Sequence, residues 1–433
     1  MTLADRIPKR DAIVIVVGLG RVGLPLAVAL ARAGHRVTGV DVDFTRAESI
    51  RNGKVPFHDP GTQEALSSIL KSDRFGIAPA REVVSDAHIV IFCIGTPMTN
   101  ELRADYAQLT AALDEVVPYL VPGQLLIQRS TVSPGTLQKV VLPFLRQRIP
   151  EVVDHLLLAA CPERIAEGQA MIELYTLPEI IGGINEESAQ AAAALFRTLS
   201  VDKVIHITDP ISAELAKLFT NVYRYVNFAL SNEFAILSEY HGADVHRIIH
   251  MVNDRYPRSR VPRPGPAGGP CLSKDGYFLV EELSLPDFVL VAWKLNDSAP
   301  GYLVRRLANA LTASGYTLDG TRVAVLGRAF KRDSDDLRQS PACRIAEILK
   351  REGAEMRAHD PFLPGPTLEQ ALTGAQAFVV ATNHSHYETI DPEQIGQWMD
   401  EPKVAVDCWN MLDRSAFRRA GIEVTTFGVG GQR

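Results

Sequence analysis

Residues 12–41 read AIVIVVGLGRVGLPLAVALARAGHRVTGVD, and this stretch decides the fold of the first part of the chain. A short β-branched run leads into a glycine-rich turn, an apolar segment with helical spacing follows, and a second β-branched run ends at Asp41. An apolar strand, a helix and another apolar strand are typical of a βαβ unit in a parallel sheet that is covered on both faces. The stretch therefore predicts a doubly wound α/β domain.

The turn between the first strand and the helix has the spacing Gly-x-Gly-x-x-Gly. Its residues are Gly18, Leu19, Gly20, Arg21, Val22 and Gly23. In this pattern the first glycine permits a tight turn, the second lets the backbone approach a pyrophosphate, and the third lets helix and strand pack closely. Asp41 would accept hydrogen bonds from the adenosine ribose and repel a 2′-phosphate, which favours NAD over NADP. Arg46 follows this acid and belongs with the candidate cofactor-binding residues, although an arginine there can instead hold that phosphate.

The rest of the chain continues the alternation, with one long interruption. Apolar runs such as HIVIFCIG and GQLLIQRST extend the first α/β region to about residue 200. Residues 212–240 contain neither Gly nor Pro and predict a helix of roughly 40 Å. A Pro/Gly-rich loop, YPRSRVPRPGPAGGPC, follows, and strand-like runs resume at TRVAVLG. We expect two Rossmann-like doubly wound domains joined by a long central helix, divided as 1–205, 206–305 and 306–433.

Composition excludes several classes of protein. The 433 residues are 46% hydrophobic and 22% charged, as in a globular protein of two or three domains. A net charge of −6 argues against a nucleic-acid or anionic-membrane binder, and no apolar stretch approaches the roughly 20 residues that cross a bilayer. The five cysteines are odd in number and scattered, with no CxxC pair, which argues against disulfides and a metal site. We expect a cytoplasmic protein.

Polar residues follow several of the predicted strands. Thr96 and Thr131 lie at strand ends, where a doubly wound sheet binds ligands, so they are candidates to line a nicotinamide pocket. Capping of the next helix is the alternative for both. Glu163 lies in the segment CPERIAEG, at the end of another predicted strand. A carboxylate there is less easily explained as a solvent-exposed surface residue than a threonine is.

Cys271 differs from the other cysteines because it lies in the glycine-rich loop, close to Lys274. A thiol near a cation on flexible backbone is a candidate nucleophile, whereas a thiol in an apolar segment is inert. Lys217 and Asn221 lie four residues apart on the predicted long helix, so their side chains share one face. Taken alone, that face could equally be solvated.

Together these features resemble the nucleotide-sugar 6-dehydrogenases, the family of the UDP-glucose, GDP-mannose and UDP-N-acetylhexosamine dehydrogenases. The resemblance covers nearly the whole chain. It is carried by GLGRVG with Asp41, the GTP and STV segments, CPERIAEG, ELAKLFTN, GGPCLSKD and LGRAFKRDSDDLRQSP.

The resemblance implies an oxidation of the sugar C6 alcohol to a carboxylate in two NAD-dependent hydride transfers. Cys271 would be the nucleophile, forming a thiohemiacetal and then a thioester. Lys217 and Asn221 would stabilise the oxyanion on O6. Thr131, Glu163 and Asp275 would surround the hydrolytic water, with Glu163 as the preferred base.

The resemblance also implies a nucleotide site in the C-terminal domain, with Lys331 contacting the substrate. That domain lacks the glycine fingerprint, so we expect no second dinucleotide there. The family's Asp-Gly-Arg triplet is replaced here by Asp407-Cys408-Trp409-Asn410, so its arginine contact does not carry over. Gly268 and Arg258 are further candidate substrate residues; Arg258 resembles an arginine that reaches the neighbouring subunit's sugar site, but other arginines crowd the same loop.

The pair Glu163-Arg164 is closer to the branch acting on UDP-N-acetylhexosamines, of the ManNAc or GlcNAc type, and Arg164 is counted with the substrate residues. UDP-glucose or GDP-mannose oxidation is the alternative. A two-electron dehydrogenase of small hydroxy acids and a non-catalytic nucleotide-sugar-binding protein are more remote. We expect a homodimer or higher homo-oligomer, because the long helix carries apolar residues around much of its circumference.

Overall fold

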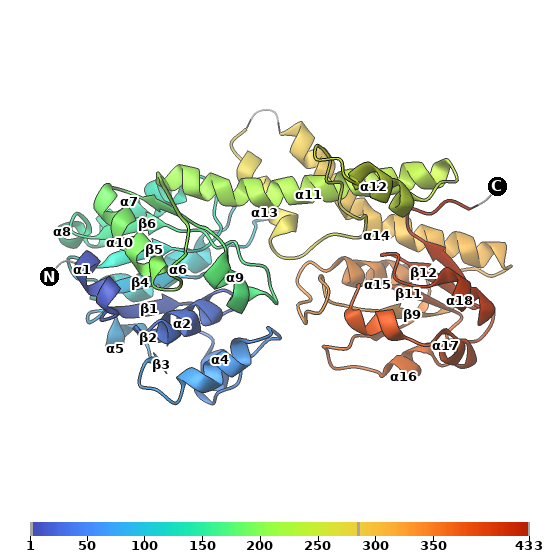
Figure 1. Ribbon diagram of the computed structural model, residues 1–433, viewed down its shortest axis with the longest axis horizontal. Helices are drawn as coiled ribbons and strands as arrows, with labels where there is room; N and C mark the ends of the chain where they lie inside the picture. Colours follow the sequence, from blue (N-terminus) through green and yellow to red (C-terminus); the bar gives the residue numbers. More distant parts are fainter. Residues whose placement is uncertain (1–2, 284–285, 432–433) are drawn as a thin grey trace. The chain divides into compact units, whose positions relative to one another are not determined.

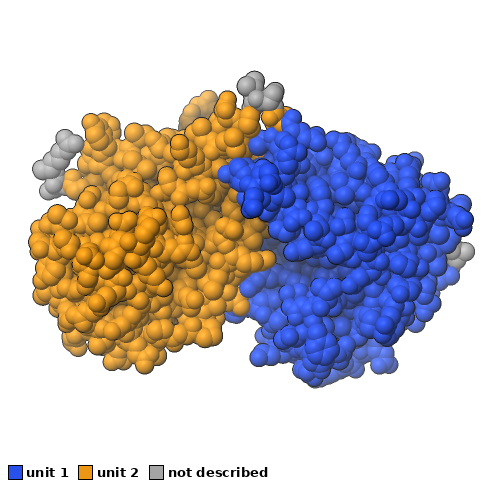
Figure 2. All heavy atoms as spheres, turned by 180° about the vertical axis from the view of Figure 1, so that it is seen from behind, with its two compact units in different colours: residues 1–220, 277–282 blue, residues 221–276, 283–433 orange. Residues whose placement is uncertain are grey.

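The computed structural model describes residues 3–283 and 286–431, so the outermost ends of the expected domains, 1–2 and 432–433, lie outside it. The chain divides into two compact units (Figure 2). The first contains Met1–Thr220 with Tyr277–Glu282, and the second contains Asn221–Gly276 with Leu283–Arg433. The finer division into 1–205, 206–305 and 306–433 stays a prediction.

The first unit is built on an eight-stranded sheet in the order β3-β2-β1-β4-β5-β6-β7-β8 (Figure 1). Every neighbouring pair is parallel except β6 and β7. The strands are β1 (Ile13–Val17), β2 (Arg36–Val40), β3 (Phe75–Ile77), β4 (Ile89–Phe92), β5 (Leu125–Gln128), β6 (Leu157–Ala160), β7 (Glu179–Gly183) and β8 (Ile205–Thr208). The chain reverses its direction of travel across the sheet between β1 and β4, so the crevice for a ligand is expected at the carboxyl ends of these two strands.

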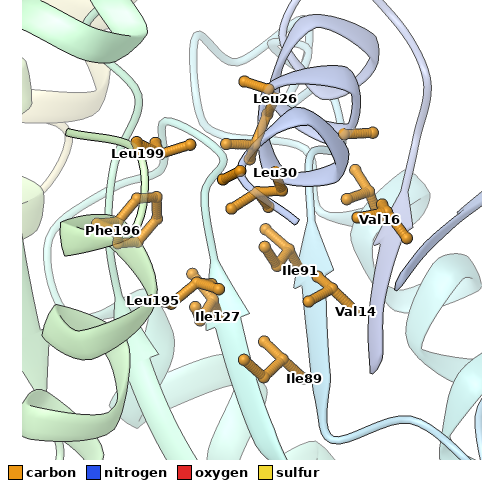
Figure 3. Packing of buried hydrophobic residues seen from close by; sticks show 14 of the residues in the cluster. Val14, Val16, Leu26, Leu30, Ile89, Ile91, Ile127, Leu195, Phe196 and Leu199 are labelled. Atoms are coloured by element: carbon orange, nitrogen blue, oxygen red, sulfur yellow. The ribbon is translucent and has the colours of Figure 1, made fainter. Parts of the chain in front are cut away.

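Helices cover both faces of this sheet. They are α1 (Leu3–Arg6), α2 (Gly23–Arg32), α3 (Phe44–Arg51), α4 (Thr62–Ile69), α5 (Ala80–Val83), α6 (Ala107–Val116), α7 (Leu142–Arg148), α8 (Pro150–Val153), α9 (Ala170–Thr176) and α10 (Glu186–Arg197). Val14 and Val16 of β1 pack with Leu26 and Leu30 of α2 on one face (Figure 3). Ile15 of the same strand belongs to a second core on the opposite face. The continuous apolar strands expected from the sequence are thus explained by burial on both sides.

Long helices connect the two α/β regions. Helix α11 (Pro210–Tyr240) runs for 31 residues without a break, and the prediction of a long helix there is confirmed. It is followed by α12 (Val245–Asn253), by α13 (Leu272–Val280) and by α14 (Asp287–Ala313). Residues 254–271, the Pro/Gly-rich stretch, contain neither helix nor strand.

The second unit carries a five-stranded, fully parallel sheet in the order β10-β9-β11-β12-β13. Its strands are β9 (Arg322–Leu326), β10 (Glu355–His359), β11 (Ala377–Val380), β12 (Val404–Asp407) and β13 (Glu423–Thr426). Its helices are α15 (Pro341–Arg351), α16 (Leu368–Leu372), α17 (Pro392–Trp398) and α18 (Arg414–Arg419). The reversal of direction lies between β9 and β11, so both sheets have the doubly wound arrangement that the sequence predicts. No helix among the described residues combines the length and the apolar character needed to cross a bilayer.

Candidate active site

In the glycine turn after β1, the middle glycine leaves space for a ligand and the two outer glycines do not. Gly18 has a φ of 90°, and a β-carbon on it would lie 2.6 Å from the carbonyl oxygen of Cys93. A β-carbon on Gly23 would lie 1.8 Å from the carbonyl oxygen of Gly18. Gly20 has nothing within 4 Å at the corresponding position. The outer glycines therefore close the turn, and the middle one keeps the backbone accessible at the N-terminus of α2, where a pyrophosphate can bind.

Asp41 lies directly after β2 and is tied to this turn. Its Oδ2 accepts a hydrogen bond of 2.7 Å from the backbone N–H of Leu19, and its Oδ1 accepts one of 2.8 Å from the N–H of Asp43. Arg46 pairs with the same carboxylate at 3.0 Å. The turn and the acid are therefore held in one geometry, and the residues present fit the diphosphate and ribose of NAD.

Thr96 follows β4 at the reversal point of the first sheet. Its side chain is buried, and its hydroxyl has no hydrogen-bond partner among the described residues. A buried hydroxyl normally finds a partner, so this one is available to a bound group. Thr131, which follows β5, is half-buried.

Glu163 belongs to a buried network of charged side chains. Its Oε2 accepts hydrogen bonds from Arg129 Nε at 2.9 Å and Nη2 at 2.6 Å. Its Oε1 accepts from the backbone N–H groups of Arg164 at 2.6 Å and Ile165 at 2.8 Å. Arg129 is 1% exposed and also pairs with Glu179. All the donors directed at Glu163 favour its ionised form.

The two carboxylates of this network have pKa values that move in opposite directions. Burial alone would raise the pKa of Glu163, but Arg129, the two backbone N–H groups and Lys217 together lower it. Burial dominates at Glu179 and raises its pKa, against the attraction of Arg129. The ionised form is therefore favoured more strongly at Glu163 than at Glu179, and Lys217 on α11 contributes to this at Glu163.

In the second unit, Cys271 lies immediately before α13 and is the exposed member of the five cysteines. Burial raises the pKa of Cys93 to about 12 and also raises the pKa values of Cys161, Cys343 and Cys408. These four thiols stay protonated at neutral pH. Cys271 is thus singled out by its position, as the sequence predicts.

Asp275 lies one turn into α13 and is fully buried. Asn221 donates its amide to Asp275 Oδ2 at 2.6 Å, and Lys274 donates to Oδ1 at 2.8 Å. Asn221, Asp275 and Cys271 are therefore brought together around the N-terminal turn of α13. Lys217 lies one helical turn before Asn221 on α11, in the portion that belongs to the first unit.

The loop that precedes Cys271 is anchored to the segment that carries Lys331. The backbone N–H of Gly269 donates to the carbonyl oxygen of Gln339 at 3.0 Å. A β-carbon on Gly269 would lie 2.5 Å from the Phe330 ring, and one on Gly268 would lie 2.6 Å from Pro341. Both glycines are thus required for close packing, which gives Gly268 a structural reason to be present.

The side chains of two arginines of the expected substrate set make local contacts of their own. Arg164 donates from its guanidinium to the carbonyl oxygen of Pro178 at 2.6 Å, which gives it a local structural contact. Arg258 is exposed and stacks on Tyr256, 4.8 Å from its ring centroid. Its neighbours in sequence line a surface hollow of about 530 Å³, whose lining residues are Asn253, Arg255, Tyr256, Pro257, Ser259, Arg260 and Val261.

Sequence reasoning missed Arg129 and Glu214. Glu214 accepts hydrogen bonds from the N–H groups of Gly135 at 2.5 Å and Leu137 at 3.0 Å, which ties α11 to the turn after Thr131. Arg129 ends the apolar run LLIQR, and a charged residue at that position indicates a buried charge that needs a partner. Its partners could not be identified from the sequence, because Glu163 and Glu179 lie 34 and 50 residues away.

A glycine turn that fits a pyrophosphate, an acid at the ribose position and an exposed thiol in a second α/β unit define the class of the protein, an NAD-binding dehydrogenase with a second Rossmann-like domain. Family models match it in three consecutive parts. They describe the NAD binding domain (residues 12–200), the central domain (211–295) and the UDP binding domain (324–414) of the UDP-glucose/GDP-mannose dehydrogenase family. The chain belongs to this family.

Individual relatives match over nearly the full chain. A UDP-N-acetyl-D-mannosamine dehydrogenase of Methanococcus maripaludis is 31% identical over 429 residues, covering 96% of this chain and 97% of the relative. The solved UDP-D-ManNAc dehydrogenase of Pyrococcus horikoshii superposes with a TM-score of 0.91 at 31% identity, covering 96% and 99% of the two chains. A UDP-glucose dehydrogenase of Pyrobaculum islandicum superposes with a TM-score of 0.85 at 28% identity, covering 97% and 98%. The protein is therefore an enzyme of the UDP-sugar dehydrogenase type that uses NAD.

Proposed function

We propose that this enzyme oxidises the C6 hydroxyl of a UDP-N-acetylhexosamine, of the ManNAc or GlcNAc type, to the carboxylate in two successive steps. The observation that carries the proposal is the placement of Cys271, the exposed thiol, beside Asn221 and Asp275 at the start of α13. The similarity to UDP-N-acetyl-D-mannosamine dehydrogenases supports the choice of sugar. Such a uronic-acid sugar nucleotide would supply polysaccharide or glycoconjugate synthesis.

The thiol makes the second oxidation possible. NAD, when bound, accepts a hydride from the carbon that is oxidised. The Cys271 thiolate adds to the C6 aldehyde and, once the oxygen is protonated, forms a thiohemiacetal, in which C6 is again tetrahedral and carries a hydroxyl group and a hydrogen that can leave as hydride. After that carbon is oxidised, C6 is held as a thioester of Cys271. The start of α13 favours a negative charge, because the first N–H groups of a helix point toward it.

Two side chains of α11 are suited to stabilise the oxygen at C6. Lys217 supplies a positive charge, and Asn221 supplies an amide donor that Asp275 holds at 2.6 Å. Each preorganised donor of this kind contributes roughly 3–4 kcal/mol to lowering such a barrier. Their spacing of one helical turn puts both on the same face of α11.

Hydrolysis of the thioester requires an oriented water molecule. We assign the orientation of this water molecule to Glu163, with Thr131 and Asp275 as the other residues that would surround it. The four hydrogen bonds to its carboxylate hold Glu163 ionised and fill its acceptor positions, so the water would take the place of one of these donors. Its lowered pKa makes it a weaker base than an ordinary glutamate, which means that alignment of the water is a larger part of its contribution than proton uptake.

Cofactor and nucleotide are assigned to separate units. Gly18, Gly20 and Gly23 would receive the pyrophosphate of NAD, and Asp41 with Arg46 would receive its adenosine ribose. Thr96 and Thr131 would line the nicotinamide pocket. Lys331 and Gly268 of the second unit, together with Arg164 and Arg258, remain the proposed substrate residues.

The test is the stoichiometry and sugar dependence of NADH formation. The purified enzyme should form two NADH for each UDP-ManNAc or UDP-GlcNAc consumed, and UDP-glucose and GDP-mannose serve as comparison substrates. Cys271→Ala should form no acid. A fully active alanine variant would exclude the thioester route, one NADH per sugar would indicate a simple alcohol dehydrogenase, and a clear preference for UDP-glucose would favour the alternative sugar.

We further propose that the enzyme is at least a homodimer that buries the exposed apolar side of α11. Tyr223 is 67% exposed, Leu230 is 45% exposed and Leu237 is 47% exposed. Large apolar side chains exposed along one long helix are typical of a surface that another chain covers. Leu230→Lys combined with Leu237→Lys should give a monomer by light scattering, and a wild-type monomer would contradict the proposal.

A further inference from the structure

The second unit repeats the hydrogen-bond geometry of the NAD turn at the end of β9. Gly327 has a φ of 89°, close to the 90° of Gly18. Arg328 donates its backbone N–H to Asp360 Oδ2 at 2.7 Å, as Leu19 does to Asp41. Phe362 donates its N–H to Asp360 Oδ1 at 2.9 Å, as Asp43 does to Asp41 Oδ1. Asp360 is therefore the counterpart of the ribose-binding acid.

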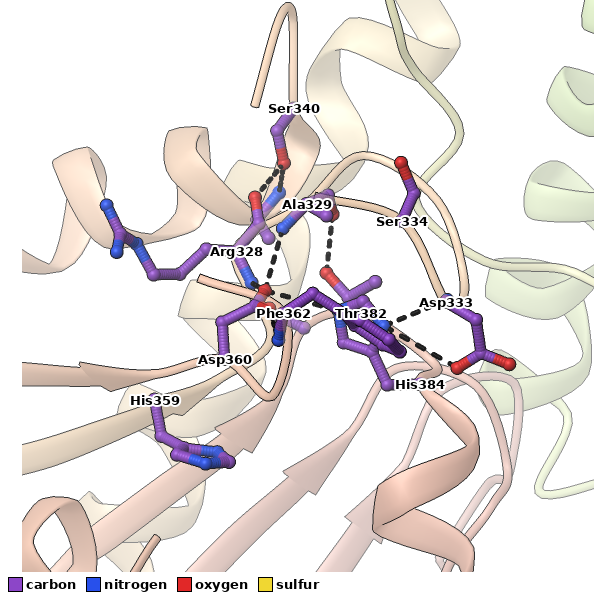
Figure 4. Close-up of polar contacts among 12 residues, drawn as sticks. Arg328, Ala329, Asp333, Ser334, Ser340, His359, Asp360, Phe362, Thr382 and His384 are labelled. Carbon is purple, nitrogen blue, oxygen red and sulfur yellow. Dashed lines mark hydrogen bonds and ion pairs between the residues drawn. The ribbon is translucent and has the colours of Figure 1, made fainter. Parts of the chain in front are cut away.

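Asp360 also accepts from the backbone N–H of Ala329 at 3.1 Å, and the side-chain partner of the acid differs between the two units. Asp41 is paired with Arg46, whose side chain is 36% exposed. Asp360 is instead contacted by the fully buried His384, whose Nε2 lies 3.2 Å from Asp360 Oδ2 (Figure 4). The carboxylate of Asp360 is thus held by a buried ring nitrogen of its own unit in place of the partly exposed guanidinium at Asp41.

His384 also holds a strained loop. The backbone N–H of Asp333 donates to His384 Nδ1 at 2.9 Å, so Nδ1 carries no proton and Nε2 carries the one directed at Asp360. Asp333 has a φ of 51°, a conformation that side-chain-bearing residues disfavour. Its carboxylate accepts hydrogen bonds from the N–H of Ser385 at 2.8 Å and from the Ser385 hydroxyl at 2.9 Å. One short segment after β11 therefore fixes this part of the loop.

Side-chain hydrogen bonds also hold the segment 327–341 near its two ends. Thr382 donates its hydroxyl to the carbonyl oxygen of Ala329 at 2.6 Å, and Ser340 donates to that of Arg328 at 2.6 Å. Residues 327–341 follow β9 and pass beside the end of β11, where a doubly wound sheet of this order binds its ligand. They contain Lys331, and they contact the loop of Cys271 through Gly269 and Gln339.

We propose that His384 is a positioning residue for nucleotide binding: by accepting from the backbone N–H of Asp333, it fixes the 327–341 segment in the shape that receives the UDP moiety, while its contact with Asp360, which three backbone N–H groups also hold, orients the ring. The inference rests on the proposed function in so far as this segment serves the UDP-sugar. It concerns the nucleotide and not the sugar. His384 acts through the backbone of the segment and contacts no reacting atom in this role.

The hydrogen bonds of the two ring nitrogens can be tested separately. Asparagine can replace the acceptor at Nδ1, and glutamine can replace the donor at Nε2. In His384→Asn the amide oxygen takes the position of Nδ1 and can still accept from Asp333. In His384→Gln the amide group reaches the position of Nε2 and can donate to Asp360, but the acceptor for Asp333 is lost. Calorimetric titration of the full chain with UDP measures the result without depending on any particular sugar.

We expect His384→Gln to bind UDP about tenfold more weakly, as for the loss of one buried hydrogen bond, and His384→Asn to bind within about twofold of wild type. With UDP-sugar as substrate, His384→Gln should raise KM more than it lowers kcat. NAD affinity should not change in either variant, since its turn lies in the first unit. Equal losses in the two variants, or no loss in His384→Gln, would overturn the proposal.

Asp333 provides a second pair of variants if the histidine variants do not fold. Its side chain is 38% exposed, so substitution there removes little packing. Asp333→Asn keeps an acceptor for Ser385 and should bind UDP as wild type does, whereas Asp333→Ala should bind several-fold more weakly. Asp333→Ala keeps the backbone N–H that donates to His384 but loses the Ser385 contacts that hold the same conformation, so wild-type affinity would show that UDP binding does not depend on the shape of the segment at Asp333 and would also overturn the proposal. An enzyme that binds UDP with these differences but oxidises no UDP-N-acetylhexosamine would contradict the proposed function alone.

Discussion

The Nη2 atom of Arg129 lies 2.6 Å from Oε2 of Glu163, and both side chains are buried in the first unit. The same guanidinium pairs with Glu179 and stacks on Phe196, 4.7 Å from its ring centroid. One arginine therefore compensates two buried carboxylates, one of which is the residue proposed to orient the hydrolytic water.

Replacing Arg129 by methionine should lower the free energy of unfolding by about 3–5 kcal/mol, because removing one partner leaves buried charges without compensation. Urea unfolding measures the change. Arg148→Met is the matched control, since Arg148 pairs with Asp114 at 3.0 Å with both side chains about half exposed. An exposed pair contributes less than about 1 kcal/mol. Equal losses in the two variants would show that the network does not stabilise the fold.

The glycine turn predicts different defects for two alanine substitutions. Gly23→Ala would place a β-carbon 1.8 Å from the Gly18 carbonyl oxygen, so it should lower the melting temperature as well as NAD affinity. Gly20→Ala meets no protein atom within 4 Å, so it should weaken NAD binding by crowding the pyrophosphate while the melting temperature stays near wild type. Thermal melts and fluorescence titration with NAD distinguish the two. Unchanged NAD affinity in Gly20→Ala would argue against pyrophosphate binding at this turn.

The contact between the Cys271 loop and the 327–341 segment predicts a catalytic defect at Gly269. A β-carbon there would press on Phe330 at 2.5 Å, and the φ of 99° disfavours any side chain. Gly269→Ala should therefore displace the loop and lower kcat by at least about tenfold, with NAD affinity unchanged. The burst of NADH in single-turnover experiments measures it.

Gly315 supplies the control for backbone strain in that experiment. It has a φ of 83° but no atom within 4 Å of a β-carbon, so Gly315→Ala carries the conformational strain without the collision. We expect a modest loss of stability and normal kcat. If both alanine variants lose activity to the same extent, general destabilisation and not the Phe330 contact accounts for the effect.

His35 predicts a loss of stability in weak acid. Burial first, and then the nearby charges of Arg10 and Arg74, lower its pKa from 6.5 to about 4. Between those two pH values the unfolded chain binds a proton that the folded chain does not. The free energy of unfolding should therefore fall as the pH drops from 6.5 to about 4, with a slope from this group of at most about 1.4 kcal/mol per pH unit, and should not change above 6.5 on its account.

The measurement is urea unfolding at pH 4.5, 5.5, 6.5 and 7.5. His35→Gln, which can keep a donor for the Thr198 hydroxyl that His35 contacts at 3.0 Å, should reduce the slope. His155→Gln at an exposed site should leave it as in wild type. A slope that His35→Gln does not change would refute the assignment of the acid sensitivity to His35.

Much of the fold could be predicted because its signals are local. The βαβ rhythm, the glycine turn with Asp41 and the uninterrupted helix of α11 each occupy one continuous stretch, and the structure confirms these elements. The position of Cys271 in an exposed loop could be predicted for the same reason. Arg129 could not be paired with Glu163 and Glu179, because charge at a strand end reveals only that a partner is needed and not which residue supplies it.

The amino-acid sequence alone therefore determined the two α/β regions, the long helix and the NAD-binding dehydrogenase class, since spacing and residue type encode periodicity and turns. Only the tertiary structure decided how the side chains are engaged. Asp41 and Asp360 both follow a strand in the sequence, yet one is paired with a partly exposed arginine and the other with a fully buried histidine. The physical reason is that hydrogen bonding and burial depend on groups brought together from distant parts of the chain, such as His384, 24 residues beyond Asp360.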